Sequence, residues 1–323
     1  MKRMAYRILV LAVGLFSACR KPEKPWKLPE GTGGRVIEAN TGTEYDTVVF
    51  VSMELGTTHS KLRREWDLLL YPRGSTYQVW LNAAMYAFAA QVSEAEWQQI
   101  TQPSPSLPWK CDLADTAALP SLQEGDLLYF ILDRDRGEAF YRQLRQRYRK
   151  VRLSWQGREV EVLALSMDGR DTALWRLPVA ATPIYLSLDR PGTPVEIAPV
   201  WRSELVLTRY IHPFYDQPEE FRWYPVLGAL LGDGVEAAAV RTAETPYQDM
   251  DFAKAQQLSY SSRRDLIGYD WKRYDFNTGT YTVDLSRYFV IRTGPMTYYK
   301  LRFIDFYDGQ GRKGNVKIEY EPL

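Results

Sequence analysis

Hydrophobic and polar residues alternate in two segments that each follow a Gln-Gly-Arg sequence. Residues 159–162 read Glu-Val-Glu-Val, and residues 315–320 read Asn-Val-Lys-Ile-Glu-Tyr. Alternation with a period of two places one kind of residue on each face of an extended chain, so both segments are predicted to be antiparallel strands with one exposed face. Residues 48–51, in contrast, are apolar at every position, which predicts a central strand that is covered on both faces.

Helical patterns are scarce in this chain. The sequence Ser93-Glu94-Ala95-Glu96 is a capping box, and it predicts a short helix that continues to Ile100. A second short helix is predicted near residues 252–258. The fold class expected from these patterns is all-β, with antiparallel strands and few short helices.

One pattern in the chain occurs twice. Residues 47–54 (TVVFVSME) are matched by residues 182–189 (TPIYLSLD), and in each copy a tryptophan, Trp66 or Trp201, follows the serine by 14 residues. We interpret this internal similarity as two related β-rich repeats, an N-terminal one over residues 40–177 and a C-terminal one over residues 178–323.

The amino terminus has the pattern of an exported lipoprotein. Basic residues precede a short apolar run from Ile8 to Phe16, and the small pair Ser17 and Ala18 precedes Cys19. The run is shorter than the roughly 20 residues that span a bilayer, so residues 1–18 are predicted to be a signal peptide and Cys19 the site of lipidation, for example by palmitate. Residues 19–39, rich in Pro and Gly, are predicted to tether the body to the membrane.

Charge does not indicate a strongly charged partner. The signal peptide holds three of the 41 basic residues and none of the 40 acidic ones, so the mature chain has a small net negative charge. The basic run at residues 141–152 corresponds in position to residues 299–307 of the second repeat, which favours a solvated strand face over nucleic-acid binding. With Cys19 lipidated, Cys111 remains as a single thiol, so no intrachain disulfide is expected.

No motif for catalysis is present. The sequence has no GxSxG, Walker, GxGxxG or HExxH motif, and its two histidines are His59 and His212. His59, in a polar segment that resembles a turn between strands, is interpreted as a surface histidine. Paired aspartates such as those at 133 and 135 lack the dense acidic loop of a calcium site. We therefore expect no catalytic residues, no metal site and no enzymatic activity.

His212 lies in an unusually aromatic stretch. If residues 205–213 form a strand, Thr208, Tyr210 and His212 share one face with Val206. Aromatic residues follow closely, and together they suit the edge of a cleft for a flat, apolar ligand. The alternative is a histidine whose ring nitrogens bond to backbone carbonyls at the end of a strand.

Residues 266–323, together with LVLTRY at 205–210, YPVLGALLGDGVEAA at 224–238 and REWDLLL at 64–70, resemble the HmuY family of Bacteroidetes lipoproteins. The resemblance implies an all-β protein that is anchored to the outer membrane and that captures haem without catalysis, for uptake through a TonB-dependent receptor. The two histidines that ligate haem in the type member correspond here to Thr208 and Tyr71.

His212, on the same strand face as Thr208, is then a candidate to replace the missing histidine as a haem ligand. The other candidates are Tyr210, Tyr71, Met250 and Met296, since His, Met and Tyr all serve as axial donors. Threonine and tyrosine in the ligand positions favour an alternative function: an accessory interaction lipoprotein of an outer-membrane transporter or surface complex that does not bind haem.

Overall fold

The computed structural model describes residues 33–136, 140–141 and 144–323, without the side chains of residues 144, 145 and 220. The predicted signal peptide, Cys19 and the tether up to residue 32 lie outside the described residues. Residues 35–39, also predicted to be tether, belong instead to strand β1 (Arg35–Asn40), because Ile37 and Ala39 pack into a core. The predicted tether therefore extends too far.

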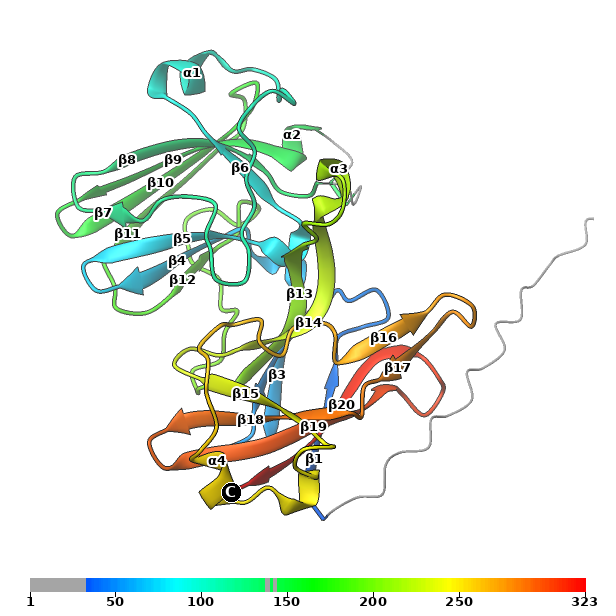
Figure 1. Cartoon of the computed structure of the whole chain (residues 1–323). Helices are drawn as coiled ribbons and strands as arrows, with labels where there is room; N and C mark the ends of the chain where they lie inside the picture. Colours follow the sequence, from blue (N-terminus) through cyan, green and yellow to red (C-terminus); the bar gives the residue numbers. More distant parts are fainter. Residues whose placement is uncertain (1–32, 137–139, 142–143) are drawn as a thin grey trace, which may run out of the picture.

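Two β-sandwiches, one above the other in Figure 1, make up the described chain. The first, which we call the terminal sandwich, combines strands from both parts of the chain that flank the second sandwich. Its five-stranded sheet has the order β1-β20-β19-β18-β15, and its four-stranded sheet has the order β14-β13-β2-β3. The remaining strands of these sheets are β2 (Thr47–Ser52), β3 (Thr57–Leu62), β13 (Leu205–Pro213), β14 (Trp223–Leu231), β15 (Glu236–Arg241), β18 (Arg287–Gly294), β19 (Thr297–Tyr307) and β20 (Lys313–Pro322).

The second sandwich, the insert sandwich, is built from the segment between β3 and β13. Its sheets have the orders β11-β10-β9-β8-β6 and β12-β4-β5-β7. The strands are β4 (Leu68–Arg73), β5 (Thr76–Leu81), β6 (Phe88–Gln91), β7 (Leu122–Gln123), β8 (Leu127–Asp133), β9 (Tyr148–Gln156), β10 (Glu159–Ser166), β11 (Thr172–Pro178) and β12 (Ile184–Leu186). A separate hairpin of β16 (Lys272–Asp275) and β17 (Thr280–Val283) completes the sheets.

The helices are short. They are α1 (Glu94–Gln99), α2 (Leu144–Arg147), α3 (Glu219–Arg222) and α4 (Phe252–Ala255), with 3-10 turns η1 (Arg63–Glu65), η2 (Ala83–Met85) and η3 (Tyr247–Asp249). The capping box is confirmed, because the Ser93 hydroxyl accepts from the backbone N–H of Glu96 while the Glu96 carboxylate accepts from Ser93. α4 lies within the second predicted helix. None of the helices in the described ranges could span a bilayer.

The all-β fold class is confirmed, and so are the strands read from alternation. The two alternating segments are β10 and β20, and β2 is covered on both faces. Val49 and Val51 point into the core of the terminal sandwich, whereas Val48 and Phe50 pack on the other side, toward the insert sandwich. A strand between two packed layers needs apolar residues at every position, which explains the uninterrupted run.

The sheets group the chain differently from the two predicted repeats. Strands β1 to β3 lie before residue 178, yet β1 pairs with β20 and β2 pairs with β13. Strand β12 lies after residue 178 and pairs with β4. The boundary between the sandwiches therefore falls near residues 63 and 200, and the relation between the two repeats stays a prediction.

The basic run at residues 141–152 is only partly the predicted solvated strand. Residues 144–147 form α2 and the strand begins at Tyr148, because the run lies at the turn between β8 and β9. Lys150 is buried, with Nζ 4.9 Å from the Trp97 ring centroid, and Arg147 forms an ion pair with Asp133. Part of this basic run therefore interacts with residues of the protein itself instead of with solvent.

Candidate ligand pocket

A cavity of about 260 Å³ lies where the two sandwiches meet. The outer face of sheet β12-β4-β5-β7 forms its roof, and the outer face of sheet β14-β13-β2-β3 forms its floor. Both faces are apolar and aromatic. The roof includes Trp66, Leu69, Tyr71, Trp80 and Tyr185, and the floor includes Val48, Phe50, Val206, Thr208, Tyr210 and Leu230.

Strand alternation determines which side chains form the roof. On β4, Leu68 and Leu70 point into the core of the insert sandwich, so Leu69 and Tyr71 must point outward into the cavity. Trp80 pairs with Leu69 across the β4–β5 hairpin, and the ring of Tyr185 stands edge-on to Trp66 at 5.3 Å. The roof is therefore rich in aromatic side chains.

The same alternation on β13 forms the floor. Leu205 and Leu207 pack inside the terminal sandwich, and Val206, Thr208 and Tyr210 face the cavity, as predicted for this strand. The Thr208 hydroxyl donates to the backbone carbonyl of Arg209 at 3.1 Å. Thr208 and Tyr71, which occupy the two ligand positions that the family resemblance implies, thus line one cavity from opposite sides.

Two contacts join the sandwiches at this cavity. The Tyr71 hydroxyl, from the roof, donates a short hydrogen bond to the carboxylate of Asp233, in the turn between β14 and β15. Burial and this hydrogen bond raise the pKa of Tyr71 to about 12. The Asp115 carboxylate, in the loop between α1 and β7, accepts from the backbone N–H of Arg264 at 3.1 and 3.2 Å.

Polar groups surround the aromatic interior. Arg73, Asp115 and Asp233 are exposed, while Asp112 is buried in the wall. Asp112 accepts from the backbone N–H groups of Leu81 and Ala118, and burial nevertheless raises its pKa to about 7. The cavity thus presents apolar walls with a few convergent polar groups, which is typical of small-molecule sites.

His212 is not among the residues that line this cavity. Its ring packs edge-on against Phe214 and Tyr269, each at a centroid distance of 4.9 Å. Nδ1 has no hydrogen-bond partner in the described part of the chain, and burial lowers the pKa of the imidazole. His212 shares the strand face of Thr208, but four residues of strand correspond to about 13 Å, which carries the ring beyond the floor.

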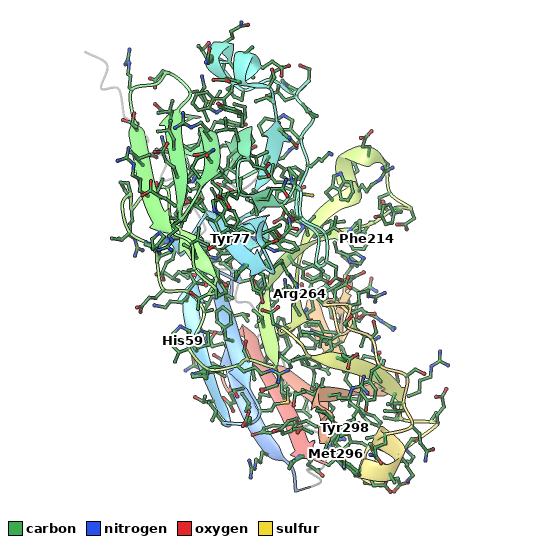
Figure 2. All side chains as sticks on the ribbon, turned by 90° about the vertical axis from the view of Figure 1, so that its left-hand side faces the viewer. His59, Tyr77, Phe214, Arg264, Met296 and Tyr298 are labelled. Carbon is green, nitrogen blue, oxygen red and sulfur yellow. The ribbon has the colours of Figure 1, made fainter. Side chains whose placement is uncertain are left out.

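The two candidate methionines also lie away from the cavity lining. Met250 is buried in a core cluster with Tyr247, Tyr288 and Tyr298. Met296 is 65% exposed, and Figure 2 shows it beside Tyr298 at the far end of the terminal sandwich, whereas Arg264 lies at the waist between the two sandwiches. Of the six candidate haem ligands, the structure brings together Tyr71, Thr208 and Tyr210.

His59 is not in a turn, because residues 57–62 form β3. Its Nε2 lies 3.2 Å from the carbonyl oxygen of Ile197, and the side chain is half-buried. This contact with the returning chain gives His59 a structural role.

Sequence reasoning missed several lining residues. It did not identify four of them, which come from four separate segments: Trp80, Asp112, Asp233 and Arg264. The only local signal was Gly-Asp-Gly at residues 232–234, which follows an apolar run and predicts a turn that presents Asp233. The others depend on long-range pairing that no local pattern encodes.

Comparison with known proteins gives a family match. The family model described as HmuY protein matches residues 44–320. Among solved structures, apo PinO from Porphyromonas gingivitis aligns with a TM-score of 0.27 and 10% identity, covering 91% of this chain and 98% of that chain. The apo HmuY analog TFO of Tannerella forsythia aligns with a TM-score of 0.26 and 12% identity, covering 90% and 95% respectively. No curated protein matches the chain.

Proposed function

Because the chain belongs to the HmuY family, we propose that it is a non-catalytic capture protein for haem or a related tetrapyrrole. The observation that carries this proposal is the cavity between the sandwiches. It is lined by aromatic side chains from both, and it contains Tyr71 and Thr208, the two positions where the family resemblance implies ligands. Flat aromatic ligands gain most from stacking and burial between such surfaces.

Tyr71 is the proposed iron donor. Tyrosine serves as an axial haem ligand, whereas a neutral threonine hydroxyl is not among the usual donors. Asp233 accepts the hydrogen bond of the Tyr71 hydroxyl and thereby orients its oxygen. The iron of the cargo would bind this oxygen in place of the phenolic proton.

The size of the cavity limits how the ligand is held. Pockets for drug-sized ligands enclose roughly 300–1,000 Å³, and this cavity of about 260 Å³ lies just below that range. A tetrapyrrole therefore requires that part of the ring protrudes or that the sandwiches separate slightly. Breaking the Tyr71–Asp233 hydrogen bond would serve both iron binding and such an opening.

A hemin titration tests the proposal. Purified mature protein should shift the Soret band of hemin with saturable stoichiometry, and Tyr71→Phe should weaken binding at least tenfold. His212→Ala serves as the comparison, because its ring lies outside the cavity lining. A shift that is lost in His212→Ala and retained in Tyr71→Phe would transfer the ligand role to His212.

Export and anchoring form the second part of the proposal. The protein would be lipidated at Cys19 and held at the outer membrane, where a TonB-dependent receptor would take over the ligand. Cells expressing the wild type should incorporate labelled palmitate into the chain and retain it in the membrane fraction. A Cys19→Ser variant that remains labelled and membrane-bound would contradict this anchor.

The alternative function is an accessory interaction lipoprotein that does not bind haem. The observation that favours it is Thr208, whose hydroxyl is bonded to the strand backbone and offers no iron donor opposite Tyr71. Co-purification from detergent-solubilised membranes separates the two functions. Recovery of a transporter together with a protein that leaves the Soret spectrum of hemin unchanged would support this alternative.

A further inference from the structure

Two arginines at the cavity, Arg73 and Arg264, form no ion pair with an acidic residue of the described ranges. Elsewhere, arginines form ion pairs with carboxylates, including Arg134 with Asp67, Arg152 with Glu161 and Arg292 with Glu236. Within the described ranges, neither Arg73 nor Arg264 forms such a pair, although both line the cavity.

The two guanidinium groups come from opposite sandwiches and line the same cavity as Tyr71. Arg73 ends β4 and stacks over the Tyr71 ring at 5.0 Å, and Arg264 uses Nε for a long bond of 3.4 Å to the carbonyl of Leu231. The positive charge of each lowers the pKa of Tyr71, opposing the larger effect of burial. Both charges therefore act on the space around the Tyr71 hydroxyl.

The nearby carboxylates are already bonded elsewhere. Asp233 accepts from the Tyr71 hydroxyl, and both oxygens of Asp115 accept from the backbone N–H of Arg264. These donors are neutral, so both carboxylates keep their charge, but neither forms an ion pair with Arg73 or Arg264. The donors of Arg73 and Arg264 remain available for an added acceptor at the edge of the aromatic cavity.

We propose that Arg73 and Arg264 form an anion subsite that binds a carboxylate of the captured aromatic ligand. The planar fork of arginine suits carboxylate oxygens, and the apolar cavity wall strengthens the attraction relative to bulk water. The subsite assigns the ligand class as planar aromatic acids. That the acid is a tetrapyrrole rests on the proposed function. Neutral aromatic molecules of the same shape are bound more weakly.

Two acid and ester pairs test the subsite by titration calorimetry. The first pair is protoporphyrin IX and its dimethyl ester, which are metal-free and so do not depend on an iron donor. The second is 2-naphthoate and its methyl ester, which are small enough for the cavity as it stands. Each acid is expected to bind at least tenfold more tightly than its ester, since a hydrogen bond to a charged group contributes a factor of about ten or more.

The variants Arg73→Gln and Arg264→Gln should each weaken acid binding about tenfold and leave ester binding within twofold. Arg158→Gln is the matched control, because Arg158 is exposed in the turn between β9 and β10. Equal affinity of acid and ester, or acid binding that is unchanged in both variants, would overturn the subsite. The same holds if neither pair binds.

The two proposals fail in different ways. If the naphthoate pair shows the expected preference and neither porphyrin nor hemin binds, the subsite stands and tetrapyrrole capture falls. If porphyrins bind without a preference for the acid, capture stands and the subsite falls.

Discussion

Arg134 and Asp67 form a buried bidentate ion pair in the insert sandwich, with 2.6 Å between Nε and Oδ1 and 2.9 Å between Nη2 and Oδ2. Arg134 also holds Asp189 through two further bonds, and Asp67 accepts from the backbone N–H of Leu188. Asp67 lies where the chain enters the insert sandwich, and Asp189 lies where it leaves. This buried arginine therefore holds together the two chain segments that enter and leave the insert sandwich, beside the cavity roof.

Replacing Arg134 by Met should lower the free energy of unfolding by about 3–5 kcal/mol, because the substitution leaves the Asp67 carboxylate buried without its partner. Urea denaturation monitored by tryptophan fluorescence measures the loss. Arg158→Met, at an exposed position, should change stability by no more than about 0.5 kcal/mol. An Arg134→Met protein as stable as this control would show that the ion pair contributes little.

Gly228 on β14 permits a close approach of the loop that contains Gly268. A Cβ at Gly228 would lie 2.5 Å from the carbonyl oxygen of Gly268 and 2.8 Å from Cε1 of Tyr210. Gly228→Ala should therefore destabilise the protein by about 1–3 kcal/mol, the usual cost of overpacking. Gly309→Ala is the control, since nothing lies within 4 Å of its added Cβ. Equal midpoints in urea for the two variants would contradict the predicted crowding.

Lys272 should make stability depend on pH. Its Nζ is buried, donates to the carbonyl of Leu227 at 2.7 Å and lies 4.4 Å from the centroid of the Trp271 ring. Burial lowers the pKa of Lys272 from 10.5 to about 7, and the charge of Asp270 opposes the shift. Between these values the unfolded chain binds a proton that the folded chain does not, so stability rises with pH, by up to about 1.4 kcal/mol per unit.

The measurement is urea denaturation of wild type and Lys272→Met at pH 7, 8, 9 and 10. The wild type should gain stability relative to the variant across this series, because methionine cannot titrate. Parallel pH profiles would mean that Lys272 keeps its proton in the folded protein.

Binding of iron porphyrin should also depend on pH, through Tyr71. Because burial and the hydrogen bond to Asp233 raise the pKa of Tyr71 to about 12, the phenol holds its proton at neutral pH and must release it to bind iron. Affinity for hemin should therefore rise up to about tenfold per pH unit between pH 6 and 9. Metal-free protoporphyrin, titrated in parallel, should lack this contribution, and identical profiles for the two would exclude a tyrosinate ligand.

Local patterns were sufficient for much of the fold. Alternation located β10 and β20, the capping box at Ser93 located α1, and the uninterrupted apolar run located β2. Each of these depends on neighbours in sequence. The pairing of β2 with β13 joins residues about 150 positions apart, and no local pattern specifies it. For this reason the boundaries of the two sandwiches differ from the boundaries of the two predicted repeats.

The candidate site shows the same limit. The face of β13 was predicted correctly, so Thr208 and Tyr210 line the cavity. Face alone does not give position along a strand, and His212 lies beyond the floor. The two similar segments, residues 47–54 and 182–189, meet in space, which their sequences did not indicate. Phe50 of the first segment and Tyr185 of the second pack in one cluster at the junction of the sandwiches.

The insert sandwich begins and ends at adjacent points, since the backbone N–H of Asp67 donates to the carbonyl of Leu186 at 2.7 Å. A segment whose two ends meet can be exchanged for another without disturbing its host. Evolution could thus replace the half that carries Tyr71 and Trp80 while leaving the half that carries Thr208 intact.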